Sequence, residues 1–139
     1  MRPDSPSDSP SDFPSGAQDA LALKSHGGFG RLLNATGYSL AGLHAALTGE
    51  AAFRQLLLLA LVLVPLAFWL QVRNLERALL VGVVIIALIV ELLNSAIEAT
   101  VDRISLELHP LSKRAKDLGS AAQMFALLLI FSVWILILI

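Results

Sequence analysis

The chain has 139 residues, enough for one compact domain; 56% of them are hydrophobic and only 15% are charged. Ordinary soluble domains carry about 25% charged residues, so this composition excludes a typical soluble fold and indicates a membrane protein. The net charge of −1 gives no electrostatic basis for binding nucleic acid, and the lack of cysteine excludes disulfides, a thiolate nucleophile and a cysteine-ligated metal.

The first 28 residues differ in composition from the rest of the chain. They hold four of the six prolines among repeated Ser and Asp. Such a segment buries too little apolar surface to offset the entropy lost on ordering, so we predict a flexible tail over residues 1–28.

Residues 29–49 place Phe29 and several leucines at helical spacing, with Arg31 and His44 on other faces. They predict an amphipathic helix at the membrane surface, although packing against other helices would also explain the leucines.

Three apolar segments follow, over residues 51–70, 75–100 and 118–139. Each is long enough to cross a bilayer as a helix, which takes about 20 residues, and Pro65 is tolerable there as a kink. The sequence therefore predicts an all-α membrane protein with three transmembrane helices and one surface helix, forming one domain over residues 29–139.

The basic residues are distributed unevenly between the ends of these spans. Of ten Lys and Arg residues, eight precede or open the first span or lie between the second and third, and only Arg73 and Arg77 lie on the other side. By the positive-inside rule, the N-terminus and the long connector face the cytoplasm and the C-terminus faces outward.

Polar residues form a row on the second predicted span. Glu91, Asn94, Ser95, Glu98 and Asp102 fall on one helical stripe, whereas the other faces are Leu, Ile, Val and Ala. An ionisable group at membrane depth costs about 2.5–3.5 kcal/mol, so this row should face a protein interior near the cytoplasmic surface.

Two explanations of the row differ in function. Interhelical hydrogen bonding is the better explanation for Asn94 or Ser95 alone. Two carboxylates without a basic partner in the spans favour a cation instead, and hard oxygen ligands suit Mg²⁺ held together with substrate phosphates. Glu50 is predicted at the same depth as Glu98 and could share that ion; capping of the first span explains it equally well on spacing alone.

The connector before the third span carries a cluster of cations. Pro110 is predicted to stop the second helix, and Ser112 is a plausible N-cap for the third. Lys113, Arg114 and Lys116 would then lie in the first helical turn, where the helix dipole disfavours cations unless an anion is bound. This predicts a phosphate site, although the positive-inside rule accounts for part of the charge.

No G-x-x-x-x-G-K-[ST] or strand-anchored G-x-G-x-x-G motif is present. Instead, residues 50–55 (EAAFRQ), 91–103 (ELLNSAIEATVDR) and 111–122 (LSKRAKDLGSAA) closely resemble the prokaryotic diacylglycerol kinase family. The resemblance runs without an evident gap from about Gly28 to the C-terminus. Its E-x-x-N-S-x-x-E-x-x-x-D pattern followed by A-K-D-x-G is highly specific.

The resemblance implies a homotrimer of three-span subunits in the bacterial inner membrane, with active sites between subunits at the cytoplasmic surface. The implied reaction is Mg²⁺-dependent transfer of phosphate from ATP to the primary hydroxyl of diacylglycerol, which gives phosphatidic acid in phospholipid recycling. It also implies that Glu91 is the catalytic base, that Glu50 and Glu98 are Mg²⁺ ligands, and that Asn94 lies beside them.

The resemblance further implies two sets of contacts. The nucleotide contacts are Arg31, Tyr38, Glu50, Glu98, Glu107, Leu108, His109, Lys116 and Asp117. The lipid contacts are Arg31, Ala35, Thr36, Gly37, Tyr38, Ser39, Leu40, Ala52, Phe53, Arg54, Gln55, Glu91 and Ser120.

The sequence departs from the family pattern at Leu56, where many members have an acid, and at Leu108, where an aromatic residue is common. A sister branch phosphorylates undecaprenol, but residues 50–55 and 119–122 resemble the diacylglycerol branch.

Two alternative functions come from other classes of protein. A small transporter or channel subunit would use the acidic row as an ion path, and a structural protein would use it only to hold a trimer together.

Overall fold

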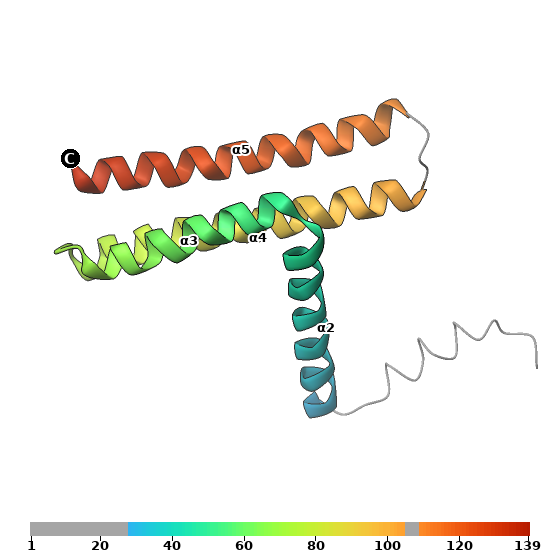
Figure 1. Cartoon of the computed structure of the whole chain (residues 1–139), viewed down its shortest axis with the longest axis horizontal. Coiled ribbons are helices and arrows are strands. Elements are labelled where there is room, and N and C mark those ends of the chain that lie inside the picture. The colour runs from blue at the N-terminus through green and yellow to red at the C-terminus, as the bar shows by residue number, and fades with distance from the viewer. Residues whose placement is uncertain (1–27, 105–108) are drawn as a thin grey trace, which may run out of the picture. The chain divides into compact units, whose positions relative to one another are not determined.

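The computed structural model describes residues 28–104 and 109–139, and all regular elements in these ranges are helices (Figure 1). They are α2 (Gly28–Gly49), α3 (Ala51–Trp69), α4 (Asn74–Ile104) and α5 (Pro110–Leu138). The last three are long and apolar enough to cross a membrane, which confirms the predicted fold class. Residues 1–27 of the predicted tail, together with Glu107 and Leu108, lie outside the described residues.

The chain divides into two compact units, residues 1–41 and 42–139, with the boundary inside α2. In the first unit, the described part of α2 is mainly exposed. In the second unit, Ala46 near the end of α2 and Phe53 near the start of α3 are both buried. Arg54 donates from Nη1 to the carbonyl oxygens of Leu47 and Thr48, at 3.3 and 3.2 Å, and so satisfies two of the terminal acceptors of α2.

Helix α4 is the centre of the three-helix bundle, because it packs against both α3 and α5 (Figure 1). Leu80, Val84 and Ala87 are completely buried and recur at helical spacing along α4. Small residues of α3 help the backbones approach one another, as is usual between membrane helices. The remaining buried core residues are Leu56, Ala60, Ala67, Val83, Ala126, Ile130 and Trp134.

The start of α5 differs from the sequence-based expectation. The helix begins at Pro110, and the Nδ1 atom of His109 accepts a hydrogen bond from the Leu111 backbone N–H at 3.2 Å. Ser112 is therefore not the N-cap. Proline suits the first helical position because its fixed φ is already helical and its missing N–H would have no intrahelical partner. Pro110 thus opens α5, and Lys116 lies in the second turn.

The Arg77 side chain makes four of the hydrogen bonds that hold the connector between α3 and α4. Its Nε donates to the carbonyl oxygen of Ala67 at 3.2 Å, and Nη2 donates to those of Leu70 and Val72 at 3.3 and 3.4 Å. Nη1 donates to Asn74 Oδ1 at 3.1 Å. These acceptors include carbonyls at the end of α3 that have no partner within the helix.

Replacing Arg77 with Ala should destabilise the purified protein by about 2 kcal/mol, because hydrogen bonds from a charged donor are lost and partly buried carbonyls are left without a donor. Thermal unfolding in detergent measures this effect. Arg73→Ala is the matched control: Arg73 is exposed and pairs only with neighbouring Glu76, so its loss should change stability little. Equal losses in the two variants would contradict the role assigned to Arg77.

Helices α4 and α5 come closest at Gly119. A Cβ atom at this position would lie 2.1 Å from Oδ1 and 3.2 Å from Cγ of Asn94. No side chain larger than hydrogen fits there unless Asn94 moves, so glycine is required by the approach of the two helices.

Gly119→Ala should therefore lower stability by about 1–3 kcal/mol through overpacking, and it should displace Asn94. Gly82→Ala is the control, because nothing lies within 4 Å of a Cβ built at Gly82 in the middle of α4. That change should be neutral or stabilising, since alanine favours a helix more than glycine does. A Gly119→Ala protein that unfolds at the wild-type temperature would show that the contact is not restrictive.

Candidate active site

Glu91 is the one buried charged residue in the described parts of the chain, with 3% of its surface exposed. It lies on α4 and borders a cavity of about 580 Å³ between the helices. Asn94 and Glu98 follow one and two turns later on α4 and border the same cavity. The other lining residues are Ala52 of α3 and Ser120, Gln123, Met124, Leu127 and Leu128 of α5. Three members of the predicted polar row, Glu91, Asn94 and Glu98, thus border an open space, whereas Ser95 and Asp102 do not line it.

Asn94 orients Glu98 within this cavity. Its Nδ2 donates to Glu98 Oε1 at 3.1 Å, so the bond stays within α4. Its Oδ1 is buried against Gly119 and has no hydrogen-bond partner. An unpaired buried acceptor costs about 1–3 kcal/mol, which a stabilising contact between helices would not explain. Within the described residues, Asn94 therefore makes a hydrogen bond along α4, to Glu98, and none to α5.

A second cavity of about 240 Å³ lies on the other side of Glu91. Gln55 and Leu56 of α3 line it, and it shares Ala52, Glu91, Gln123 and Leu127 with the first cavity. A third cavity of about 320 Å³ continues from Leu59 and Leu127 and is lined only by apolar residues and Trp134. We call the three cavities together the furrow.

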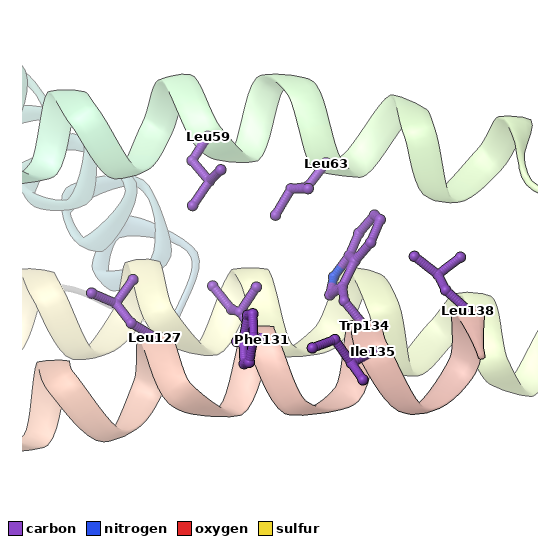
Figure 2. A pocket seen from close by; sticks show the side chains of 8 residues that line it. Leu59, Leu63, Leu127, Phe131, Trp134, Ile135 and Leu138 are labelled. Atoms are coloured by element: carbon purple, nitrogen blue, oxygen red, sulfur yellow. The ribbon is translucent and has the colours of Figure 1, made fainter.

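Figure 2 shows the apolar part of the furrow. Leu59 and Leu63 point from α3 toward α5, and the ring of Trp134 extends from α5 toward α3. Along α5 the furrow runs from Ser120 to Leu138, which is about 27 Å at the rise of an α-helix and close to the ~30 Å thickness of a bilayer core. A polar end joined to a long apolar track suits a lipid that has one small polar group.

Glu50 lies just before α3, at its N-cap position, but its side chain makes no capping hydrogen bond. The structure therefore does not support capping as the role of this side chain. Both Glu50 and Glu98 lie close enough to Glu91 to repel its negative charge. A bound cation would relieve the repulsion that Glu91 experiences from these two carboxylates.

The donor set can be tested against Mg²⁺. Among the described residues, no three acidic or histidine side chains are already arranged as a metal cage. Mg²⁺ does not need such a cage, because it is usually bound by one or two carboxylates together with water and substrate phosphates. Glu98, held by Asn94, and the uncapped Glu50 fit this requirement.

The predicted phosphate-binding residues lie where α4 ends and α5 begins. Lys116 Nζ donates to Asp102 Oδ1 at 2.6 Å and so links the two helices, and Lys113 Nζ donates to Asp117 Oδ2 at 3.0 Å. Glu98 is near enough to Lys116 to attract its charge. The cationic end of α5 and the acidic row therefore share one neighbourhood, although the predicted concentration of all three cations in the first turn is wrong.

The structure brings together only some of the predicted lipid contacts. Ala52 and Gln55 line cavities beside Glu91, and Ser120 lines the larger of them. Phe53 is buried in the protein, with 2% of its surface exposed, and Arg54 binds the carbonyls at the end of α2.

The remaining predicted contacts lie on the part of α2 that belongs to the first unit. Arg31 and Tyr38 are exposed there. The hydroxyls of Thr36 and Ser39 donate to backbone carbonyls one turn earlier, each at 2.9 Å. The other members of this set are Ala35, Gly37 and Leu40.

Sequence reasoning missed Gln123, which borders both cavities beside Glu91. It placed Asp102 in the polar row but did not predict that Asp102 pairs with Lys116. The spacing of Gln123 from Ser120 and Leu127 puts the three on one face of a helix, which is a weak sequence signal for Gln123. The facing α3 residues could be recognised only from the packing.

Comparison with known proteins agrees with this geometry. Residues 37–138 match the family model described as prokaryotic diacylglycerol kinase. A diacylglycerol kinase of Pseudomonas aeruginosa is 66% identical over 116 residues, which cover 84% of this chain and 94% of the relative. One of Escherichia coli K12 is 50% identical over 111 residues, covering 80% and 91%, and one of Haemophilus influenzae is 47% identical over 107 residues, covering 77% and 91%. The chain belongs to the prokaryotic diacylglycerol kinase family.

Proposed function

We propose that the chain phosphorylates diacylglycerol at the cavity beside Glu91, with residues 29–139 acting as one membrane kinase domain. Family membership makes it a diacylglycerol kinase that uses ATP, and the product is phosphatidic acid. The observation that carries the location of the site is the buried carboxylate of Glu91, which lies where the polar cavity meets the apolar part of the furrow. A lipid whose chains occupy the furrow would have its hydroxyl at this carboxylate.

Glu91 is the general base in this proposal. The primary hydroxyl of diacylglycerol attacks the γ-phosphorus of ATP, a new O–P bond forms, and the bond to the β-phosphate oxygen breaks to release ADP. Glu91 accepts the hydroxyl proton. Phosphoryl transfer requires mainly positioning and charge neutralisation, so a single well-placed carboxylate is enough protein chemistry for this step.

Glu98 and Glu50 are the proposed ligands of Mg²⁺, and Asn94 fixes the orientation of Glu98. Bound there, Mg²⁺ would neutralise charge on the phosphates. The repulsion that Glu50 and Glu98 each exert on Glu91 supports this assignment.

Lys116 is proposed to hold the phosphates of ATP at the mouth of the cavity. Its ion pair with Asp102 keeps the ammonium group at the junction of α4 and α5, near Glu98. The other proposed nucleotide contacts are Arg31, Tyr38, Glu107, Leu108, His109 and Asp117. Of these, His109 also caps α5.

The proposed setting is the bacterial inner membrane, with the N-terminus and the site on the cytoplasmic side. The excess of Lys and Arg at that end of the spans supports this orientation.

A homotrimer is proposed from the family resemblance. The many large apolar side chains exposed on α3, α4 and α5 are consistent with contacts to lipid and to other subunits. Membership of a kinase family accounts for the acidic row, and no observation favours an ion channel or a purely structural protein instead.

Glu91→Gln should lower the rate of lipid phosphorylation by about 10²–10⁴-fold, because the amide cannot accept the hydroxyl proton. The assay supplies labelled ATP and Mg²⁺ with either diacylglycerol or undecaprenol and measures label in the lipid. Wild-type protein should label diacylglycerol. Glu76→Gln is the control, since that acid lies at the opposite end of α4, paired with Arg73. If Glu91→Gln turns over at nearly the wild-type rate, Glu91 is not the general base. If only undecaprenol becomes labelled, diacylglycerol is not the substrate.

Glu98→Ala should raise the Mg²⁺ concentration needed for half-maximal activity by about tenfold or more, because a metal ligand is lost. The KM for ATP should rise with it, whereas the KM for diacylglycerol should change little. Titration of Mg²⁺ at fixed ATP measures the first effect. An unchanged Mg²⁺ dependence would exclude Glu98 from the ligand set.

A further inference from the structure

Gln123 is a polar residue of α5 that shares two cavities with Glu91. It lies on α5 between Ser120 and Leu127, on the same helical face as both. Its side chain borders both cavities that flank Glu91, the larger polar one and the smaller one that leads toward Leu59. Its Oε1 is buried and has no hydrogen-bond partner.

A buried carboxamide without a partner needs an explanation, because almost all buried polar groups in native proteins are paired. Asn94 is partly paired, since its nitrogen donates to Glu98. Gln123 instead faces a space shared with the apolar residues Leu56, Leu59 and Leu127. The terminal amide of glutamine rotates about a broad, nearly two-fold torsion, so either its oxygen or its nitrogen can be turned toward that space.

The hydrogen-bonding groups of diacylglycerol determine whether the oxygen or the nitrogen of the Gln123 amide would contact it. The lipid carries one hydrogen-bond donor, its primary hydroxyl, and this group is taken by Glu91 in the proposed reaction. It also carries two ester carbonyl oxygens, only a few bonds from the hydroxyl, which are acceptors. The carboxylates of the cavities cannot donate to these oxygens. The neutral side chains that can donate are Asn94, whose nitrogen is held by Glu98, Ser120, Gln55 and Gln123; of these, Gln123 alone borders both cavities.

We propose that Gln123 is a specificity-determining residue, whose Nε2 donates a hydrogen bond to an ester carbonyl of diacylglycerol. The inference rests on the proposed location of the reaction at Glu91 and extends it from the hydroxyl to the ester group. The apolar part of the furrow accepts any hydrocarbon chain with little selectivity. A site that hydrogen-bonds a polar group rejects an analogue lacking that group much more strongly. Gln123 thus favours acylglycerols over alcohols whose chains carry no carbonyl.

The test compares two lipids that share the reacting hydroxyl and the chain length. One is a 1,2-diacylglycerol, and the other is the matching 1,2-dialkylglycerol, in which ether oxygens replace the esters. The wild-type protein, in mixed micelles with labelled ATP, should use the diester with a kcat/KM about tenfold higher than that for the diether. Gln123→Met keeps the length of the side chain without its donor. It should lose most of this preference, through a higher KM for the diester and an unchanged kcat/KM for the diether.

Ser132→Ala is the matched control, because the Ser132 hydroxyl on the same helix donates to the Leu128 carbonyl at 2.7 Å and lines none of the furrow. It should keep the wild-type preference. Gln123→Leu provides a second variant, in case Gln123→Met folds poorly. Equal losses on both lipids in these variants would mean that Gln123 acts through Glu91 or through packing, and would overturn the proposal.

Two results with wild-type protein separate this inference from the function on which it rests. Equal use of diester and diether by an active wild-type protein would refute the role of Gln123 and leave the kinase assignment intact. Failure to label either lipid would refute the proposed function itself, and the inference with it.

Discussion

Burying one carboxylate among membrane helices is the constraint on which the rest of this structure depends. An ionisable group at that depth is costly, and Glu91 has no basic partner among the described residues around it. Its position is tolerable only beside polar space. Helix α4 therefore has a core face of Leu80, Val84 and Ala87 along one part of its length and a polar row along the next. The furrow is accordingly polar beside Glu91 and apolar along the rest of its length.

The polar part of the furrow is organised by charge. Glu50 and Glu98 both repel Glu91, while Lys116 forms an ion pair with Asp102 at the start of α5. In the proposed site, a nucleotide carrying both phosphates and a divalent cation would complement the acidic and the basic groups at once.

Much of the fold follows directly from the sequence. The lengths of the apolar runs predict α3 and α4, and the period of 3.6 residues predicts that Glu91, Asn94 and Glu98 share a face. The start of α5 could not be settled in this way, because proline both ends helices and opens them. Only the bond from Leu111 to the His109 ring shows which applies.

The furrow is harder to predict than the helices, since its walls come from α3 and α5, which are distant in sequence. Leu59 and Trp134 lie 75 positions apart and line the same cavity. No periodicity within one helix reports such a pairing. The family resemblance supplies roles for residues of the polar row, but it says nothing of Gln123, whose significance depends on which cavities it borders.

With the proposed lipid site in the furrow, its shape also determines how the enzyme meets its lipid. It is bordered by α3 on one side and α5 on the other, so its long dimension follows the bilayer and not the aqueous phase. Diacylglycerol would enter by lateral diffusion, and the quantity that governs encounter is its mole fraction among surrounding lipids, not its concentration in bulk volume. Diluting it with inert phospholipid slows the reaction even when the total amount is constant. The rate therefore reports the local composition of the membrane.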